Sequence, residues 1–347
     1  IGGRMNLAYN GAMNIAQRGT SETGIGASSG YFTLDRYKMF FANTAGRLTM
    51  TQTADGPTGF ANCMKLDCTT ADTSIAAGED IILSQAIEGQ DLQQLKKGTS
   101  DAEKITLSFY VKGNANAAYS VEIYDGTNDR RIGQTFSVTT DWTRVILTFP
   151  ADTTGALADS NAAGLYINWW LHAGATFTGG TFSTAWAAQT ANQRAGNTTS
   201  LLDSTNRTFF LTGVQLEVGS QATPFEHRSF GEELALCQRY FYKWESSSTY
   251  AGVGVGRAYD TSNAVAMINT PCAMRANATV TVSAVGDFAI AGIGGTPAAI
   301  SNGERTTDFR SYKLTVNQGS TPFTSGTIYQ LESDNQANAK INFDSEL

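Results

Sequence analysis

The sequence predicts an all-β protein with two domains, and three observations lead to that prediction. The chain has 347 residues, more than one hydrophobic core usually holds. It is 41% hydrophobic and only 16% charged, and Gly, Ala, Ser, Thr and Asn carry most of the polar share, a composition typical of strands and turns. Short apolar runs recur along most of the chain, separated by Gly, Asn and Thr.

The first part of the chain is predicted to be an N-terminal segment followed by a β-sandwich. Residues 1–30 contain "ETGIGASSG", which is loop composition, and the sandwich is expected over 31–228. In "ITLSFYVKG" (105–113) apolar side chains alternate with polar ones, the period of a half-buried strand. The runs at 119–125 and 142–150 repeat this pattern, so we expect consecutive antiparallel strands.

A long surface excursion and a closing strand complete this sandwich. Residues 173–206 are rich in Gly, Thr and Ala and are expected to lie on the surface. The closing strand is "RTFFLTGVQLEVGS" (207–220). Strict alternation predicts that it turns one set of side chains to one face, namely Phe210, Val214, Leu216 and Val218. It turns the other set to the opposite face, namely Phe209, Leu211, Gln215 and Glu217.

The stretch from Leu211 to Glu245 joins the two domains. After a proline turn, Ser229 or Gly231 is expected to cap a short helix whose first turn carries Glu232 and Glu233, where negative charge is favourable. Strand patterns return from Arg239 onward. Residues 229–347 are therefore predicted to form a smaller β-sandwich led by a short helix.

Charge and composition exclude several functional classes. The net charge is -7 and the 24 Lys and Arg residues are not clustered, so no nucleic-acid partner is expected. No window approaches the roughly 20 apolar residues of a membrane helix, so no membrane insertion is expected. The four cysteines (Cys63, Cys68, Cys237 and Cys272) match no metal spacing and are predicted to be reduced and buried. No metal or cofactor is predicted.

Four segments carry a resemblance to a known family. "GVQLEVGSQATPFEHRSFGEELALCQRYFYK" closely resembles a segment that recurs in phage tail-fibre and related virion proteins. "NLAYNGAMNIAQRGTS" with "GYFTLDRYKMF", "PCAMRANATVTVS" and the terminal "INFDSEL" resemble other segments of the same proteins. The resemblance implies a non-enzymatic structural component of a bacteriophage virion. It also implies a first domain like the jelly rolls of carbohydrate-binding modules, and a homotrimer that contacts other virion proteins.

One strand offers a candidate binding patch for a host-surface glycan. In "GLYINWWLHAG", Leu165, Ile167, Trp169 and Leu171 are predicted to face the core, which leaves a second set on the opposite face: Tyr166, Asn168, Trp170 and His172. Aromatic rings stack on sugar faces, and amides bond sugar hydroxyls. If that face is covered instead, the same side chains are packing or interface residues. Trp142 and Trp186 are interpreted as packing residues, and the resemblance implies that Trp186 anchors the excursion.

The predicted function is that of a tail fibre or other exterior virion appendage that binds host-surface glycans for attachment. The alternative is an architectural capsid or tail decoration without receptor binding. A glycan depolymerase is a further alternative, which needs two carboxylates in a cleft. However, Asp125 and Asp129 lie in a Gly-Asn turn, Glu217 and Glu226 are expected to pair with Arg228 or with backbone, and the long β-helix repeat of depolymerase spikes is absent.

Jelly-roll sugar modules often hold a structural calcium ion, and the oxygens that would bind it here belong to Asn6, Asn10 and Glu217. Gly213 stands where those modules often place an Asp. No calcium site is predicted on that account.

Overall fold

The computed structural model of the protein describes residues 5–196, 199–292, 295–305, 309–319, 321–335 and 337–347. The chain divides into two compact units, one of residues 1–233 with 347 and one of residues 234–346. The division falls inside helix α2 (Phe230–Gln238), a few residues after the predicted boundary at 228.

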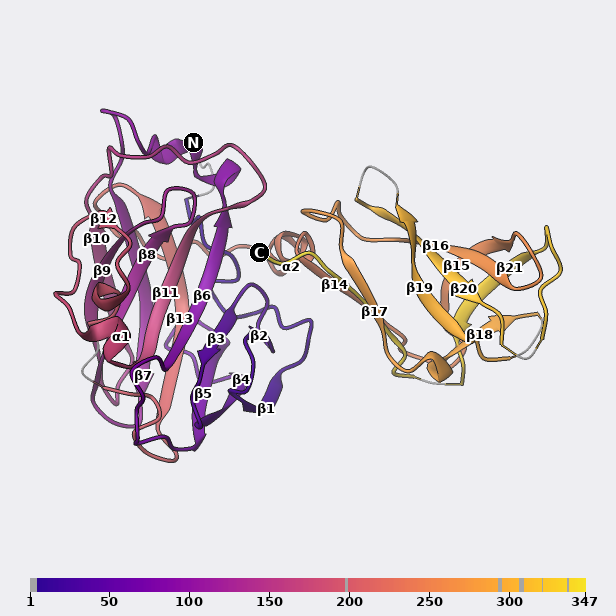
Figure 1. The fold of residues 1–347 in the computed structure, drawn as a ribbon, viewed down its shortest axis with the longest axis horizontal. Coiled ribbons are helices and arrows are strands. Elements are labelled where there is room, and N and C mark those ends of the chain that lie inside the picture. Colours follow the sequence, from indigo (N-terminus) through magenta and orange to yellow (C-terminus); the bar gives the residue numbers. More distant parts are fainter. Residues whose placement is uncertain (1–4, 197–198, 293–294, 306–308, 320, 336) are drawn as a thin grey trace. The chain divides into compact units, whose positions relative to one another are not determined.

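The first unit is a jelly-roll β-sandwich of two antiparallel sheets (Figure 1). One sheet has six strands in the order β1 (Ser21–Ile25), β4 (Arg47–Thr53), β5 (Cys63–Thr70), β13 (Thr208–Val218), β7 (Ile105–Gly113) and β10 (Thr143–Phe149). The other has seven strands in the order β12 (Ala187–Ala188), β9 (Arg130–Val138), β8 (Ala117–Asp125), β11 (Ala163–Ala173), β6 (Asp80–Glu88), β3 (Lys38–Ala42) and β2 (Gly30–Tyr31). Short helical turns are η1 (Gly89–Leu95), α1 (Ala175–Thr178) and η2 (Ala191–Gln193).

The core of this unit lies between the two sheets and confirms the predicted alternation of β7, and that of β11 as far as Trp170. Phe109 of β7 is fully buried, and its ring meets Trp169 of β11 edge-on at 5.8 Å. Phe209 and Tyr119 form a second edge-on pair across the sheets at 5.7 Å. Such pairs add to the free energy gained by burying large apolar rings.

The predicted facing of β13 is wrong in its first half because the strand contains a β-bulge. Phe209 and Leu211 are fully buried and face the core together with Val214 and Leu216, while Phe210 points outward. The pairing register with β7 shifts between Thr212 and Gln215, so one extra residue reverses the alternation. Gly213 lies at this bulge, and its φ is 63°, a left-handed conformation that glycine adopts without strain.

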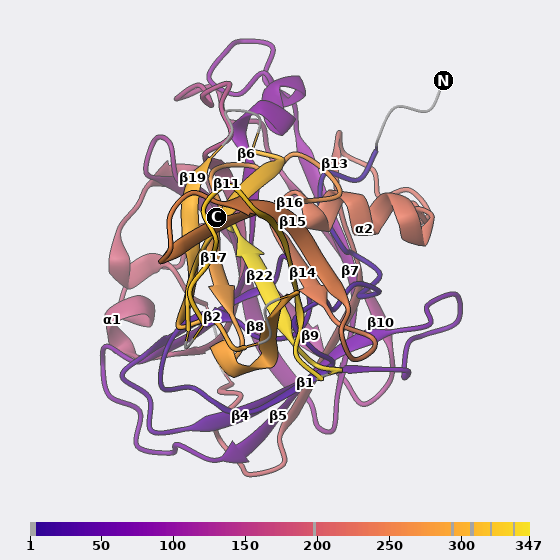
Figure 2. The ribbon, with the colours of Figure 1, turned by 90° about the vertical axis from the view of Figure 1, so that its right-hand side faces the viewer.

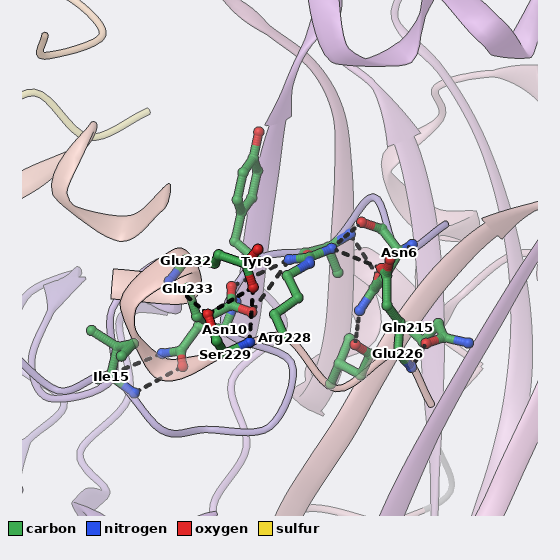
Figure 3. A network of polar contacts seen from close by, with 12 residues as sticks. Asn6, Tyr9, Asn10, Ile15, Gln215, Glu226, Arg228, Ser229, Glu232 and Glu233 are labelled. Atoms are coloured by element: carbon green, nitrogen blue, oxygen red, sulfur yellow. Dashed lines mark hydrogen bonds and ion pairs between the residues drawn. The ribbon is translucent and has the colours of Figure 1, made fainter. Parts of the chain in front are cut away.

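The N-terminal residues are built into the sandwich by a polar network with the joint (Figure 3). The backbone N–H groups of Met5 and Asn6 donate to the carboxylate of Glu226 at 3.2 and 2.8 Å. Arg228 donates to the carbonyl oxygens of Asn6 and Ala8 and pairs with Glu226 at 3.3 Å. Segments more than 200 residues apart in sequence are thereby fixed side by side.

Helix α2 begins with Ser229 as its cap, one of the two residues predicted for that position. The Ser229 hydroxyl accepts from the N–H of Glu232 at 3.3 Å, and the Glu232 carboxylate accepts from the N–H of Ser229 at 3.0 Å (Figure 3). This reciprocal pair is a capping box, which satisfies backbone donors that the first helical turn leaves unpaired.

The second unit is a smaller sandwich, as predicted. A three-stranded sheet places β22 (Lys340–Asp344) between β14 (Phe241–Glu245) and β17 (Thr279–Val282) (Figure 2). A six-stranded sheet has the order β18 (Phe288–Ala291), β21 (Ile328–Ser333), β15 (Gly252–Ala258), β16 (Asn263–Asn269), β20 (Ser311–Asn317) and β19 (Ala299–Arg305). The turn η3 (Val285–Asp287) precedes β18. Tyr312 and Phe343 meet in the buried core with ring centroids 4.9 Å apart.

Candidate functional site

A pocket lies on the outer face of the seven-stranded sheet, the face turned away from the core of the first unit. It has a volume of about 390 Å³ and crosses the neighbouring strands β3, β6, β11 and β8. We call it the outer-face pocket. Its lining residues are Ser29, Phe40, Phe41, Ala42, Asp80, Ile82, Tyr124, Tyr166, Asn168 and Arg194.

Aromatic side chains occupy both sides of this pocket. Tyr124 and Tyr166 lie opposite each other on β8 and β11, with ring centroids 5.7 Å apart and an angle of 38° between the rings. Both are partly exposed, and the Tyr124 hydroxyl donates to Asp129 at 2.9 Å. Phe40 and Phe41 on β3 line the other side. Partly exposed rings in a cleft are suited to stacking on the apolar face of a flat ligand.

A hydrogen-bond network fixes the polar floor of the pocket. Arg194 donates to both carboxylate oxygens of Glu122, at 2.9 and 2.7 Å. The amide nitrogen of Asn168 donates to the same carboxylate at 3.0 Å, and the indole N–H of Trp170 donates to it at 3.3 Å. Ser84 donates to the Asn168 amide oxygen at 2.7 Å. Glu122 is therefore fully engaged, and Arg194 and Asn168 are held in fixed orientations.

Asp80, by contrast, has no partner. Its side chain lines the pocket and the residue is 9% exposed, yet it accepts no hydrogen bond and forms no ion pair with any residue that the structure describes. Burial raises the pKa of Asp80 from 3.8 to about 6, and the nearby positive charge of Arg194 opposes that rise. A buried carboxylate without donors costs free energy unless something else supplies them.

The structure divides the four predicted site residues into two pairs. Tyr166 and Asn168 both line the outer-face pocket. The expectation that Trp170 and His172 share this exposed surface is wrong, because both side chains are completely buried.

The cover over Trp170 and His172 comes from the same chain. The ring of Phe177 lies 5.2 Å from Trp170, and the Arg194 guanidinium lies 5.0 Å above it, both from the excursion. A register shift between Trp170 and His172 places His172 opposite Ile81, out of the strict alternation. There its imidazole contacts Ser200 at 2.6 Å and Glu79 at 3.3 Å, and burial lowers its pKa.

Trp186 and Trp142 pack as predicted. The Trp186 indole N–H donates to the carbonyl oxygen of Pro150 at 2.8 Å, and the ammonium of Lys97 lies 5.4 Å from its ring centroid. This contact anchors the excursion to the sandwich. Trp142 meets Phe210 edge-on at 6.2 Å.

The other carboxylates considered from sequence are held by structural contacts. Asp125 pairs with Lys97, Asp129 accepts from Tyr124, and Glu226 pairs with Arg228. Glu217 accepts from the backbone N–H and the hydroxyl of Thr223.

The oxygens considered for calcium are also engaged by protein donors. The side-chain oxygen of Asn6 accepts from the N–H groups of Ala8 and Leu216, and that of Asn10 accepts from Ile15. Across the part of the chain that the structure describes, no three His, Cys, Asp or Glu side chains are grouped to hold a metal ion. All four cysteines are free thiols, three of them buried and Cys272 partly exposed.

Sequence reasoning missed most of the pocket. The alternation of 119–125 turns Tyr124 away from the core, so its exposure could have been predicted. No pattern in the sequence links it to Tyr166. Asp80 heads the strand "DIILSQAIE", where an acidic residue next to an apolar run looks like an ordinary strand end. Arg194 lies in the excursion, whose path no local pattern predicts.

Comparisons with known proteins give fold likenesses only. No family model and no curated protein matches the chain. A family 4 carbohydrate-binding module aligns with 60% of this chain over 97% of its own length, at 14% identity and a TM-score of 0.32. A family 11 module from Clostridium thermocellum, in complex with a mixed-linked tetrasaccharide, aligns with 59% of the chain and 98% of its own length, at 9% identity and a TM-score of 0.30.

The enzymatically active domain of tailspike protein 4 of bacteriophage CBA120 is also similar, at 12% identity and a TM-score of 0.32. That likeness spans 62% of this chain and 21% of the tailspike chain. All these scores are low, and the likenesses concern the fold alone. Among the described residues, no helix combines the length and the apolar character needed to cross a bilayer.

Proposed function

We propose that the protein is a non-enzymatic structural component of a phage virion, a tail fibre or other exterior appendage, that attaches to host-surface glycans through the outer-face pocket. The pocket carries this proposal: it combines partly exposed aromatic rings with a fixed amide, a fixed guanidinium and a free carboxylate. This is the mixture of groups that sugar recognition uses. The virion location rests on the resemblance of the joint and of three further segments.

Binding without cleavage is the proposed activity because the pocket offers one free carboxylate. Glycoside hydrolysis uses two carboxyl groups, one as acid and one as base or nucleophile. Two further carboxylates lie nearby, and both are engaged: Glu122 is bound by Arg194, Asn168 and Trp170, and Asp129 accepts from Tyr124. The Glu122 side chain is only 1% exposed, so it is not placed to reach a sugar.

Attachment is proposed to depend on several copies of the chain, assembled as a homotrimer. A single shallow pocket gives weak binding, and simultaneous engagement of several pockets raises the overall affinity about 10²- to 10⁴-fold. Sedimentation at micromolar concentration tests this part, and a stable monomer contradicts it.

The test of attachment is binding of the intact protein to host cells and to a glycan array, with a Tyr124→Ala, Tyr166→Ala double variant. We expect saturable binding that the double variant loses while its oligomer size and near-UV circular dichroism stay unchanged. Tyr259→Ala is the matched control, since Tyr259 is an exposed tyrosine of the second unit. Binding that survives in the double variant places the site elsewhere.

A purely architectural role is the second candidate, and one observation in the second unit favours it. Val255, Met267 and Ile328 are 56%, 41% and 71% exposed on one face of the six-stranded sheet. Apolar side chains gathered on a sheet face are typical of surfaces that contact another protein. A correctly assembled oligomer that binds neither cells nor glycans would favour this role.

A further inference from the structure

We infer that the outer-face pocket selects uncharged sugar residues over acidic ones, and that Asp80 makes this selection by accepting hydrogen bonds from sugar hydroxyls. The inference rests on the proposed glycan-binding function and names the class of glycan that the same site takes. Three observations on the pocket carry it: the unpaired state of Asp80, the balance of charges, and the position of Asp80 relative to the rings.

The carboxylate of Asp80 is a free acceptor in a confined place. The residue is about nine-tenths buried, lines the pocket and has no donor among the described residues. An ionised carboxylate accepts up to about four hydrogen bonds. Hydroxyls on adjacent carbons of a sugar ring present paired donors, and bonds from them to a charged acceptor are stronger than bonds between neutral groups.

Two charged side chains line the pocket, Asp80 and Arg194, and of these only Asp80 is unpaired. Among the described lining residues Arg194 is the cation, and both carboxylate oxygens of Glu122 already accept from that guanidinium. The ammonium of Lys38 lies beside the pocket, 4.8 Å from the centroid of the Phe40 ring. Asp80 adds a second negative charge, and no described residue forms an ion pair with it. A glycan carrying carboxylate, sulfate or phosphate groups would meet this charge at short range in a partly desolvated site, where repulsion is strong.

The aromatic residues place the sugar next to Asp80. Phe40 and Ala42 lie on β3 beside Asp80 and Ile82 of β6, while Tyr166 lies across the pocket on β11. A sugar ring stacked on these side chains is within the same 390 Å³ cavity as the carboxylate. Replacing the carboxylate with an amide changes its charge and one acceptor without changing its shape.

The experiment measures binding of neutral and acidic sugars to the intact protein and to Asp80→Asn. The probes are β-1,4-linked hexasaccharides of glucose, mannose and galactose, each paired with the same oligosaccharide oxidised at C6 to the uronate. A glycan array with neutral, uronic, sialylated and sulfated members extends the range. Asp141→Asn is the matched control, because Asp141 is an exposed aspartate in the turn between β9 and β10.

For the wild-type protein we expect a neutral glycan to bind at least tenfold more tightly than its acidic counterpart. Asp80→Asn should weaken binding of the neutral glycan by about tenfold to a hundredfold, the effect of losing a charged hydrogen-bond acceptor. It should also reduce the ratio between the affinities for the neutral and the acidic glycan. Asp141→Asn should bind like wild type. Preferential binding of acidic glycans, or an Asp80→Asn variant that binds and discriminates like wild type, overturns the inference. Absence of binding by every glycan refutes the proposed function itself.

Discussion

The unpaired carboxylate of Asp80 should lower the free energy of unfolding of the protein without a bound glycan, and replacing Asp80 should raise it. Because burial raises the pKa of Asp80 from 3.8 to about 6, the folded state disfavours the ionised carboxylate. The folded protein then holds this proton more tightly than the unfolded chain does. The contribution of Asp80 to stability is therefore largest below about pH 4 and is lost as the pH rises through about 6.

The size of the effect follows from the two pKa values. The difference between 3.8 and about 6 corresponds to about 3 kcal/mol at pH 7. The same linkage leaves only about 0.5 kcal/mol at pH 4. Asp80→Asn keeps the shape and removes the charge, so the free energy of unfolding should rise by up to about 3 kcal/mol at pH 7 and by much less at pH 4, the upper limit applying if the amide finds hydrogen-bond partners.

Urea unfolding followed by tryptophan fluorescence measures this difference. The signal reports mainly on the first unit, which contains four of the five tryptophans: Trp142, Trp169, Trp170 and Trp186. Comparing wild type, Asp80→Asn and Asp141→Asn at pH 7 and pH 4 cancels the titration of all other groups. An Asp80→Asn variant that is less stable at pH 7, or whose gain is equal at both pH values, refutes the reasoning.

Three further substitutions should each lower the free energy of unfolding, measured by the same urea titration unless stated. Gly213→Ala should lose about 2 kcal/mol, because a left-handed φ strains alanine and the new Cβ would lie 2.8 Å from the ring of Tyr110. An unchanged midpoint of urea unfolding would contradict this expectation. Ser229→Ala should cost about 1 kcal/mol by removing the helix cap, and circular dichroism showing equal thermal stability would argue against that role. Lys97→Met should cost about 3 kcal/mol, because it leaves the buried carboxylate of Asp125 without its cation. A loss under about 1 kcal/mol would show that this ion pair contributes little to stability.

Local patterns in the sequence were enough to predict the strands and the joint. The alternation of 105–113 depends only on the period of two along a strand, and the structure buries Phe109 as that period requires. Ser229 is one of the two residues predicted to cap the helix, and the structure shows that its hydroxyl bonds the Glu232 side chain three residues away. Both features are set by neighbours in the chain.

Predictions failed where a strand departs from regular geometry. One extra residue at Gly213 reverses the alternation of β13, and a register shift before His172 moves that side chain off the predicted face. A glycine inside a strand pattern can mark a bulge, but the sequence alone does not say whether the partner strand accommodates one. Pairing with β7 and β6 settles that question.

The sequence by itself determined an all-β chain, the course of its strands, and the two pocket residues that alternate along β11, Tyr166 and Asn168. Only the tertiary structure decided what covers the outer face of the sheet. The excursion buries Trp170 but brings Arg194 into the lining of the outer-face pocket, and the pairing of β6 with β3 and β11 places Asp80 in the same lining. The physical reason is that periodicity acts between residues close in sequence, whereas exposure and unpaired charge depend on which distant segments pack together.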